Sequence, residues 1–167
     1  MEDVSLYEPI QNSLERVNNG LKELVDLSAP HLGELLSHVL ETGGKRVRPA
    51  ITLFSANFHP HNDTVIETMA TAIELLHIAT LIHDDTIDDA DIRRGKATVS
   101  TMWNRKAAVL LGDFVFASSA PFVCDTGNIR VIRRFSETIM ELSSGELLEM
   151  AATYSPGQSR TQYIDRI

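Results

Sequence analysis

Apolar residues recur along this chain at steps of three and four, which is the spacing of one face of an α-helix. The first such run extends from Leu6 to Leu24. A second helix is expected to begin around Ser28 and Pro30, because serine caps helices and proline fits the first helical turn. Gly43 and Gly44 are expected to end it. Pro49 is expected to open a third helix that runs to Ala56.

The longest helical pattern lies in the middle of the chain, from Thr64 to about Ala90, and contains no Gly or Pro. Between Met69 and Ile82 it is apolar on most of its circumference, which predicts a buried, central helix. Further helices are expected from Thr101 to Ala117 and from Ile129 to Thr153, and another begins near Ser159. We find no convincing strand pair. The fold class is therefore predicted to be all-α, with residues 1–167 forming one domain.

Composition is that of a soluble globular protein, with 43% hydrophobic and 23% charged residues. The net charge of −8, without a long basic run, argues against nucleic-acid binding. The single cysteine, Cys124, excludes an internal disulfide and a cysteine-built zinc site. The start resembles no signal peptide, and Asp113 and Pro121 interrupt the most apolar stretch. A cytoplasmic protein without a transmembrane segment is expected.

Five carboxylates fall within eight residues at the end of the central helix: Asp84, Asp85, Asp88, Asp89 and Asp91. On a helix, Asp84 and Asp88 lie one turn apart, roughly 6 Å along the axis and about 40° around it. With Asp85, they can face one volume of space. Such charges repel, and Mg²⁺ compensates well because it takes one or two carboxylates together with water and phosphate oxygens. The segment therefore predicts a magnesium-dependent diphosphate site.

Three other interpretations of the acidic segment fit the sequence to different degrees. A solvated helix end is the ordinary one, but the run follows a strongly apolar helix, where buried charges need partners. An EF-hand fits poorly because no register places glycine at loop position six with glutamate at position twelve. His83-Asp84, with His77 six residues earlier, resembles the metal-dependent HD phosphohydrolases, which are also all-helical. That alternative stays open.

Two basic segments accompany the acidic one. The first, at residues 43–49, carries Lys45, Arg46 and Arg48, which cannot all point one way. Its glycines let a ligand approach the backbone, and the helix that follows offers free N–H groups to an anion. The second segment holds Arg93 and Arg94, whose guanidinium groups suit phosphate. A basic surface loop and neutralisation of the neighbouring aspartates are the alternatives.

Together these segments resemble the N-terminal half of the trans-type polyprenyl diphosphate synthase family. The matching segments are Gly-Gly-Lys-Arg-x-Arg-Pro at 43–49, Glu74-Leu-Leu-His77, His83-Asp-Asp-x-x-Asp88 and Arg93-Arg-Gly95. The resemblance implies an isoprenoid-synthase-type helical bundle and a Mg²⁺-dependent prenyltransferase. Such an enzyme condenses isopentenyl diphosphate with an allylic diphosphate to give a longer trans-polyprenyl diphosphate.

The resemblance also implies roles for single residues. The first aspartate-rich motif, which is catalytic and holds magnesium against the allylic diphosphate, is matched by Asp84, Asp85 and Asp88. Arg93 matches an arginine on the same diphosphate. The positions that grip isopentenyl diphosphate are matched by Lys45, Arg48, His77 and Arg94. Asp89 and Asp91 lie outside the motif and are expected to add charge around it.

Product length has a marker just before the aspartates. Family members with short products tend to carry bulky aromatics one turn before the motif, whereas this chain has Ala79 and Thr80. We therefore expect an open shaft and products longer than C20.

Two family features are missing from these 167 residues. No second aspartate-rich motif follows Asp91, and the chain stops before a Lys-Thr pair expected shortly after Tyr163. A truncated chain is expected, with little activity of its own, exposed apolar surface and association into a homodimer. A non-catalytic subunit of a heteromeric synthase usually lacks an intact Asp-Asp-x-x-Asp run. Terpene cyclases share that run but generally not the Gly-Gly-Lys-Arg-x-Arg-Pro segment.

Overall fold

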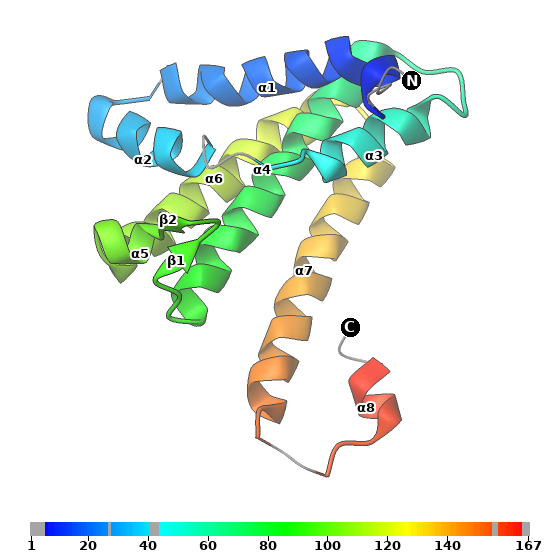
Figure 1. Ribbon diagram of the computed structural model, residues 1–167. Coiled ribbons are helices and arrows are strands. Elements are labelled where there is room, and N and C mark those ends of the chain that lie inside the picture. The colour runs from blue at the N-terminus through cyan, green and yellow to red at the C-terminus, as the bar shows by residue number, and fades with distance from the viewer. Residues whose placement is uncertain (1–5, 27, 41–43, 155–156, 165–167) are drawn as a thin grey trace, which may run out of the picture. The chain divides into compact units, whose positions relative to one another are not determined.

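The computed structural model describes residues 6–26, 28–40, 44–154 and 157–164 (Figure 1). The chain divides into two units, residues 1–126 and residues 127–167, and each is described by itself. Every residue predicted for the site lies in the first unit. That the whole chain forms one domain stays a prediction.

The first unit is built almost entirely of helices (Figure 1). Its elements in chain order are the 3₁₀ helix η1 (Glu8–Ile10), α1 (Gln11–Asp26), α2 (Pro30–Leu40), α3 (Val47–Ala56), α4 (Asp63–Ile87), β1 (Ile92–Arg93), β2 (Lys96–Ala97), α5 (Val99–Met102) and α6 (Arg105–Asp125). The all-α class and the isoprenoid-synthase-type bundle are confirmed. The predicted end of the second helix at Gly43 lies outside the described residues.

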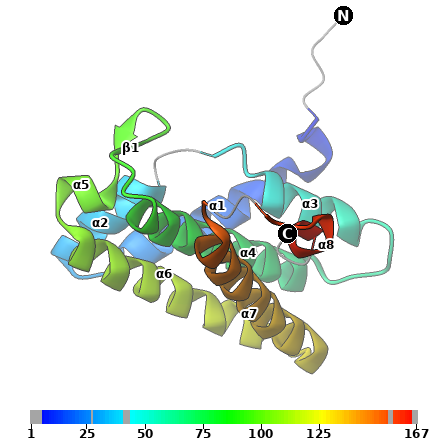
Figure 2. The ribbon, with the colours of Figure 1, turned by 90° about the horizontal axis from the view of Figure 1, so that it is seen from below.

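Helix α4 is the central element of this unit. The Asn62 side chain caps its start by accepting hydrogen bonds from the backbone N–H groups of Thr64 (3.0 Å) and Val65 (3.4 Å). The helix packs against α1, α3 and α6 (Figure 2), and Ala70, Ala72 and Leu75 are fully buried along it. The predicted burial of this helix is confirmed, although it ends at Ile87 rather than near Ala90.

Two apolar clusters hold the helices together, and α4 contributes to both. The larger cluster joins α1, α2, α4 and α6 through residues that include Leu21, Leu36, Leu75 and Val115. The smaller joins η1, α1, α3 and α4 through Ile10, Val17, Ala50, Leu53 and Ala70. Each fully buried leucine or valine adds about 1.5–3 kcal/mol to the stability of the fold. These clusters therefore fix which face of α4 is buried and which face remains available for the site.

The region after α4 differs from the prediction in its helix bounds. Instead of one helix from Thr101 to Ala117, a short helix α5 precedes α6, and the Asn104 side chain caps α6 by accepting a hydrogen bond from the Ala107 N–H (2.9 Å). Helix α6 continues through Pro121. Proline removes one backbone hydrogen bond, but Ser119 and Val123 on either side are buried, so packing keeps the helix intact.

The expected absence of a strand pair is wrong at one place. Strands β1 and β2 pair in antiparallel fashion, with Ile92 opposite Ala97 and Arg93 opposite Lys96. The turn between them is formed by Arg94 (φ 51°) and Gly95 (φ 80°), the left-handed conformations that a two-residue hairpin turn requires. With two residues in each strand, no alternation of apolar and polar positions marks the hairpin in the sequence.

The second unit contains α7 (Ile129–Ala152) and α8 (Arg160–Ile164). The Asn128 side chain caps α7 by accepting hydrogen bonds from the N–H groups of Arg130 (3.0 Å) and Val131 (3.4 Å). Along the helix, Arg134 pairs with Glu141 at 2.8 Å. The predicted helix from Ile129 to Thr153 agrees to within one residue. Ser155 and Pro156, which follow in the sequence, lie outside the described residues.

Within the part of the chain that the structure describes, two helices, α4 and α6, are long and apolar enough to cross a membrane by length and composition alone. Most of the apolar part of α4 is buried inside the fold, as in the core helix of a soluble protein, and α6 contains Asp113 and Pro121. Length and composition are therefore weak evidence for a membrane span here.

Candidate active site

Four side chains predicted to bind one diphosphate line the same pocket. Lys45 and Arg48 flank the start of α3, His77 lies on α4, and Arg94 forms the hairpin turn. The rest of the wall consists of Gly44, Arg46, Val47 and Glu74. The fold thus brings three segments that are distant in the sequence to one basic cavity, which we call the cation pocket.

His77 and Arg48 are in direct contact in this pocket. The Arg48 Nη1 group donates a hydrogen bond to His77 Nε2 at 3.0 Å. Burial, followed by the positive charge of Arg48, holds the pKa of His77 below its ordinary value of 6.5. The imidazole is therefore neutral near pH 7, and as a hydrogen-bond acceptor it orients the guanidinium group of Arg48.

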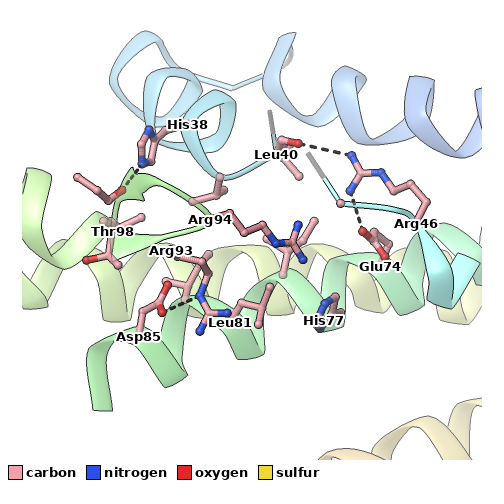
Figure 3. A pocket seen from close by; sticks show the side chains of 16 residues that line it. His38, Leu40, Arg46, Glu74, His77, Leu81, Asp85, Arg93, Arg94 and Thr98 are labelled. Atoms are coloured by element: carbon pink, nitrogen blue, oxygen red, sulfur yellow. Dashed lines mark hydrogen bonds and ion pairs between the residues drawn. The ribbon is translucent and has the colours of Figure 1, made fainter. Parts of the chain in front are cut away.

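Arg94 lies close to Gly44 in the pocket. A Cβ atom at Gly44 would approach Arg94 Nη1 to 3.0 Å, so any side chain there would press against the guanidinium group. Figure 3 shows Arg94 extending from the hairpin toward the side of Arg46 and His77. The left-handed turn at Arg94 and the glycine at 44 together place this cation.

The three cations of this segment do not all point one way, as predicted, and Arg46 is bound on its interior side. Its Nη1 group donates to Glu74 Oε1 at 2.7 Å, and its Nε group donates to Asn18 Oδ1 at 3.0 Å. Lys45 and Arg48 are exposed, whereas Arg46 is largely buried. The basic segment therefore divides between the pocket and the interior.

The aspartates at the end of α4 separate into two directions. Asp84 and Asp88 are about 40° apart around the helix, whereas Asp85 is turned roughly 100° from Asp84. Burial, followed by the negative charge of Asp88, raises the pKa of the half-buried Asp84. Asp85 is buried and accepts a hydrogen bond from Arg93 Nε at 2.6 Å (Figure 3). Asp84 and Asp88 thus share a face that is rich in negative charge.

Among the described residues, no three His, Cys, Asp or Glu side chains lie close enough together to hold a metal ion. The pair of Asp84 and Asp88 nevertheless fits Mg²⁺, which takes one or two protein carboxylates and keeps other positions for water and phosphate oxygen. The repulsion that raises the pKa of Asp84 is the interaction that a bound cation relieves. Metal ligation by Asp84, Asp85 and Asp88 stays a prediction.

The two remaining aspartates hold the chain after α4 in place. Asp89 has a left-handed backbone (φ 53°), and its carboxylate pairs with Arg105 at the start of α6. Asp91 accepts hydrogen bonds from Thr101 Oγ1 (3.3 Å) and, through its carbonyl oxygen, from the Thr98 N–H (3.0 Å). Both residues therefore tie the hairpin region to α5 and α6.

The two residues predicted to set product length lie apart from the pockets described here. Ala79 is buried in the larger apolar cluster with 2% of its surface exposed. Thr80 is half-buried, and its hydroxyl donates a hydrogen bond to the His77 carbonyl at 2.8 Å. Their role in product length stays a prediction.

A second pocket adjoins the cation pocket between α2, α4 and the hairpin (Figure 3). Its walls include Ile78, Leu81, Ile82 and Val99, and it shares Arg46, Glu74, His77 and Arg94 with the cation pocket. The cations therefore stand beside an apolar surface from which water is partly excluded.

Sequence reasoning missed His38, which connects α2 to the hairpin. Its Nε2 atom lies 2.8 Å from the Ala97 carbonyl oxygen, and its ring packs edge-on against Trp103 with 5.6 Å between ring centroids. Because β2 pairs with β1, this contact supports the strands that carry Arg93 and Arg94. A single histidine in an apolar helix gives no sequence signal for such a contact.

The HD phosphohydrolase alternative requires His77 and His83 to bind one metal ion. His77 contacts Arg48, whereas His83 lies against α6, 3.4 Å from Asp113 Oδ1 and 3.3 Å from the Val109 carbonyl oxygen. The two histidines thus have different partners on different sides of α4, and the comparisons below give this alternative no support.

The fold and the site define a helical protein of the isoprenoid-synthase type, with a cation pocket that includes His77 of α4 and a group of carboxylates at the end of the same helix. A family model described as "Polyprenyl synthetase" matches residues 29–167. The chain belongs to this family.

Three relatives show the extent of the match. The chain is 36% identical over 163 residues to heptaprenyl diphosphate synthase component 2 of Geobacillus stearothermophilus, covering 98% of this chain and 51% of that protein. The crystal structure of heptaprenyl diphosphate synthase from Staphylococcus aureus has a TM-score of 0.87 at 33% identity, covering 93% of this chain and 50% of that one.

A polyprenyl synthase from Caulobacter crescentus CB15, complexed with calcium and isoprenyl diphosphate, has a TM-score of 0.90 at 27% identity. The match covers 96% of this chain and 49% of that one. The chain therefore spans about half the length of the relatives that it matches.

Proposed function

We propose that this chain is the N-terminal, substrate-binding half of a prenyltransferase that joins isopentenyl diphosphate to an allylic diphosphate. The product is a trans-polyprenyl diphosphate longer than C20. The observation that supports this most is the convergence of Lys45, Arg48, His77 and Arg94 on one pocket. The second pocket shares His77 and Arg94 with it and extends to Asp85 and Arg93, beside the end of α4 that carries Asp84 and Asp88.

The cation pocket binds the diphosphate of isopentenyl diphosphate in this proposal. Arg48 and Arg94 offer forked N–H donors that match phosphate oxygens, and Lys45 adds a compact positive charge. His77, neutral near pH 7, binds Arg48 and fixes the direction of its guanidinium group. These groups hold a diphosphate without a metal ion.

The aspartate face takes the allylic diphosphate through Mg²⁺ held by Asp84 and Asp88, with Asp85 as the third carboxylate of the motif. Bound there, Mg²⁺ would neutralise the negative charge of the departing diphosphate. Arg93, held by Asp85 at 2.6 Å, adds a positive charge at the edge of this face. The related Caulobacter structure, complexed with calcium and isoprenyl diphosphate, supports a divalent cation and an isoprenoid diphosphate as ligands.

The reaction requires that the allylic C–O bond breaks and its electron pair leaves with the diphosphate. The double bond of isopentenyl diphosphate attacks the resulting carbocation, a C–C bond forms, and a proton is lost. Water would quench the cation, and the apolar side chains of Ile78, Leu81 and Ile82 next to the site limit its access.

The relatives' names support a long product. Two are named for heptaprenyl diphosphate, whose chain is longer than C20. Ala79 and Thr80 are small, but neither lines a pocket described above, so this part of the proposal rests on the comparisons.

The Geobacillus relative is described as one component of its synthase, and a partner chain for this protein is part of the proposal. The intact run from Asp84 to Asp88 favours the catalytic component over a non-catalytic subunit. A homodimer and a cytoplasmic location belong to the same proposal. The exposed Val109, Leu110 and Phe116 on α6 support association with another copy. Sedimentation velocity of the chain would show a dimer, and a strictly monomeric chain would contradict that part.

The proposal is tested by calorimetric titration of the 167-residue chain with two ligands, each in Mg²⁺ and in EDTA. Isopentenyl diphosphate is expected to bind equally well in both buffers, because its site consists of cations. Geranylgeranyl diphosphate is expected to bind only with Mg²⁺, because its site consists of carboxylates. Binding of neither ligand in Mg²⁺ would contradict the proposal.

A matched pair of variants locates the first ligand. Arg48→Gln removes a cation from the pocket and is expected to weaken isopentenyl diphosphate binding at least about tenfold, the loss of a charge-assisted hydrogen-bond pair. Arg134→Gln removes the same charge from α7, where Arg134 pairs with Glu141, and is expected to change nothing. Equal affinities for the two variants would place the ligand elsewhere.

A further inference from the structure

Arg46 is the one cation of its segment that the proposed reaction does not use, and its environment is unusual. Its backbone has a left-handed φ of 50°, which is unfavourable for a side chain of this size, and it occupies the N-cap position of α3. Its side chain is 16% exposed, although arginine is almost never buried without partners. The surrounding structure must therefore hold it in place.

Three helices supply the partners of Arg46. Asn18 on α1 accepts from Nε (3.0 Å), the Leu40 carbonyl at the end of α2 accepts from Nη2 (3.4 Å), and Glu74 on α4 accepts from Nη1 (2.7 Å). Figure 3 shows the contacts with Leu40 and Glu74. One side chain thus joins the loop before α3 to α1, α2 and α4.

The ion pair with Arg46 compensates the buried charge of Glu74. Its side chain is 5% exposed, and a buried carboxylate requires a compensating charge. Glu74 also lines both pockets, so its negative charge lies at the wall that a diphosphate would approach. Arg46 neutralises that charge from the interior side.

The pair connects the two walls of the cation pocket. Arg46 directly follows Lys45 and precedes Arg48 by two residues, and Glu74 precedes His77 by three residues on the same helix. A displacement of the loop relative to α4 would change the distance between Arg48 and His77, which are now 3.0 Å apart. The Arg46–Glu74 contact opposes such a displacement.

We propose that Arg46 and Glu74 are positioning residues of the cation pocket. Their ion pair sets the spacing between the Lys45–Arg48 loop and His77, and it shields the ligand from the negative charge of Glu74. The inference rests on the proposed function only in that the pocket takes a diphosphate. Both residues line the pocket, and in this inference they act by holding its walls in place rather than by binding the ligand.

The test is the affinity of the 167-residue chain for inorganic pyrophosphate and for isopentenyl diphosphate in EDTA, measured by calorimetry. Arg46→Met is expected to weaken both ligands by more than about tenfold, because Glu74 is left unpaired beside the pocket. Glu74→Gln is expected to weaken them by about threefold to tenfold, because the guanidinium group loses its strongest anchor. Arg46→Met with Glu74→Gln is expected to bind more tightly than Arg46→Met alone.

Glu74→Gln separates positioning from simple charge. It removes a negative charge from the pocket wall, so a role through charge alone predicts tighter binding of both anions. Weaker binding supports positioning, and equal or tighter binding overturns the inference. Because the substitution preserves shape, this variant decides the question even if Arg46→Met does not fold.

Glu67→Gln is the matched control. Glu67 forms a similar ion pair with Arg16 (2.5 Å) between α1 and α4, away from the pocket. Its substitution is expected to leave pyrophosphate affinity unchanged, and a loss equal to that of Glu74→Gln would overturn the inference. Failure of the unmodified chain to bind either ligand would overturn the proposed function as well. Normal binding with unchanged affinity in the variants would overturn only this inference.

Discussion

Asp84 and Asp88 carry like charges on one face of α4, and the folded chain gains nothing from that arrangement by itself. Burial and the charge of Asp88 raise the pKa of Asp84, which means that the ionised form is disfavoured in the folded state. Residues that oppose folding in this way are common where a ligand supplies the missing charge. This repulsion supports the proposal that a cation binds between the two carboxylates.

Asp88→Asn should have opposite effects on folding stability and on Mg²⁺-dependent ligand binding. Removing one of two neighbouring charges is expected to raise the free energy of unfolding by a few tenths of a kcal/mol. The same change is expected to weaken Mg²⁺-dependent binding of geranylgeranyl diphosphate at least about tenfold. Urea unfolding and calorimetry measure the two effects. Isopentenyl diphosphate binding in EDTA should stay as it was.

Asp125→Asn, at the end of α6, serves as the control for charge. It removes one negative charge outside the proposed site and should leave both ligands unaffected. If Asp88→Asn retained full Mg²⁺-dependent binding, the role proposed for this carboxylate would be wrong.

At the scale of elements, the contact between α4 and α6 depends on Gly112. A Cβ atom there would lie 2.2 Å from His83 Nε2, a distance that forces the imidazole ring to move. The ring would then lose its contacts with Asp113 and the Val109 carbonyl. Gly112 is thus a packing requirement of the helix pair that carries the site.

Gly112→Ala is expected to lower the free energy of unfolding by about 1 kcal/mol, since the clash outweighs the better helix propensity of alanine. In a His83→Ala background the clash is absent, so the same substitution should stabilise the chain by about 0.5–1 kcal/mol. Urea unfolding of the unmodified chain, the two single variants and the double variant measures whether Gly112→Ala changes from destabilising to stabilising. Gly20→Ala, where the nearest atom would be 3.6 Å away on Thr71, should also stabilise. A stabilising effect in both backgrounds would show that His83 does not fill this space.

The ion pair between Arg16 and Glu67 links α1 to α4 and makes stability depend on pH. Hydrogen bonds from Arg16 hold the pKa of Glu67 below its ordinary value of 4.5. A lowered pKa in the folded state adds stability at pH values above 4.5, and this stability is lost as the pH falls through the lower folded value. Glu67→Gln should therefore lower the urea midpoint at pH 7 and have a smaller effect below pH 4.5. If the two urea midpoints differed by the same amount at every pH, this prediction would be wrong.

Sequence reasoning located most helices because their apolar spacing is strong and local. The central helix was predicted within three residues at each end, and its burial followed from its apolar circumference. The hairpin was missed since it has two residues per strand, and its signal is a turn at Arg94 and Gly95 rather than an alternating pattern. Packing, not local preference, carries α6 past Pro121.

The sequence suggested which residues belong to the candidate site, but it did not predict the contacts that they make. The residues of the cation pocket come from three segments, and only the family resemblance joined them before the structure was known. Two contacts depend on the fold: the turn of Asp85 toward Arg93 and the burial of Arg46 against Glu74. Arg46 has a left-handed backbone, so its side chain does not take the direction that it would have in an extended loop.

At the scale of the whole molecule, these 167 residues contain one aspartate cluster and match about half the length of their relatives. Mixed with geranylgeranyl diphosphate, labelled isopentenyl diphosphate and Mg²⁺, the chain is expected to form little or no labelled long product, because the family's second aspartate-rich motif is not among these residues. Extraction and thin-layer chromatography measure the label. Substantial incorporation into products beyond C20 would show that one cluster is sufficient.

The two proposed diphosphate sites are distinguished most directly by NMR of the isotope-labelled 167-residue chain. Isopentenyl diphosphate in EDTA is expected to shift the amide signals of Gly44 to Arg48 and those around His77 and Arg94, and to leave Asp84 and Asp88 nearly unchanged. Geranylgeranyl diphosphate with Mg²⁺ is expected to shift the signals of residues 84–88 and 93. If isopentenyl diphosphate left the signals of the cation pocket unmoved, or if EDTA did not abolish the shifts at residues 84–88, the assignment of two adjoining diphosphate sites would be wrong.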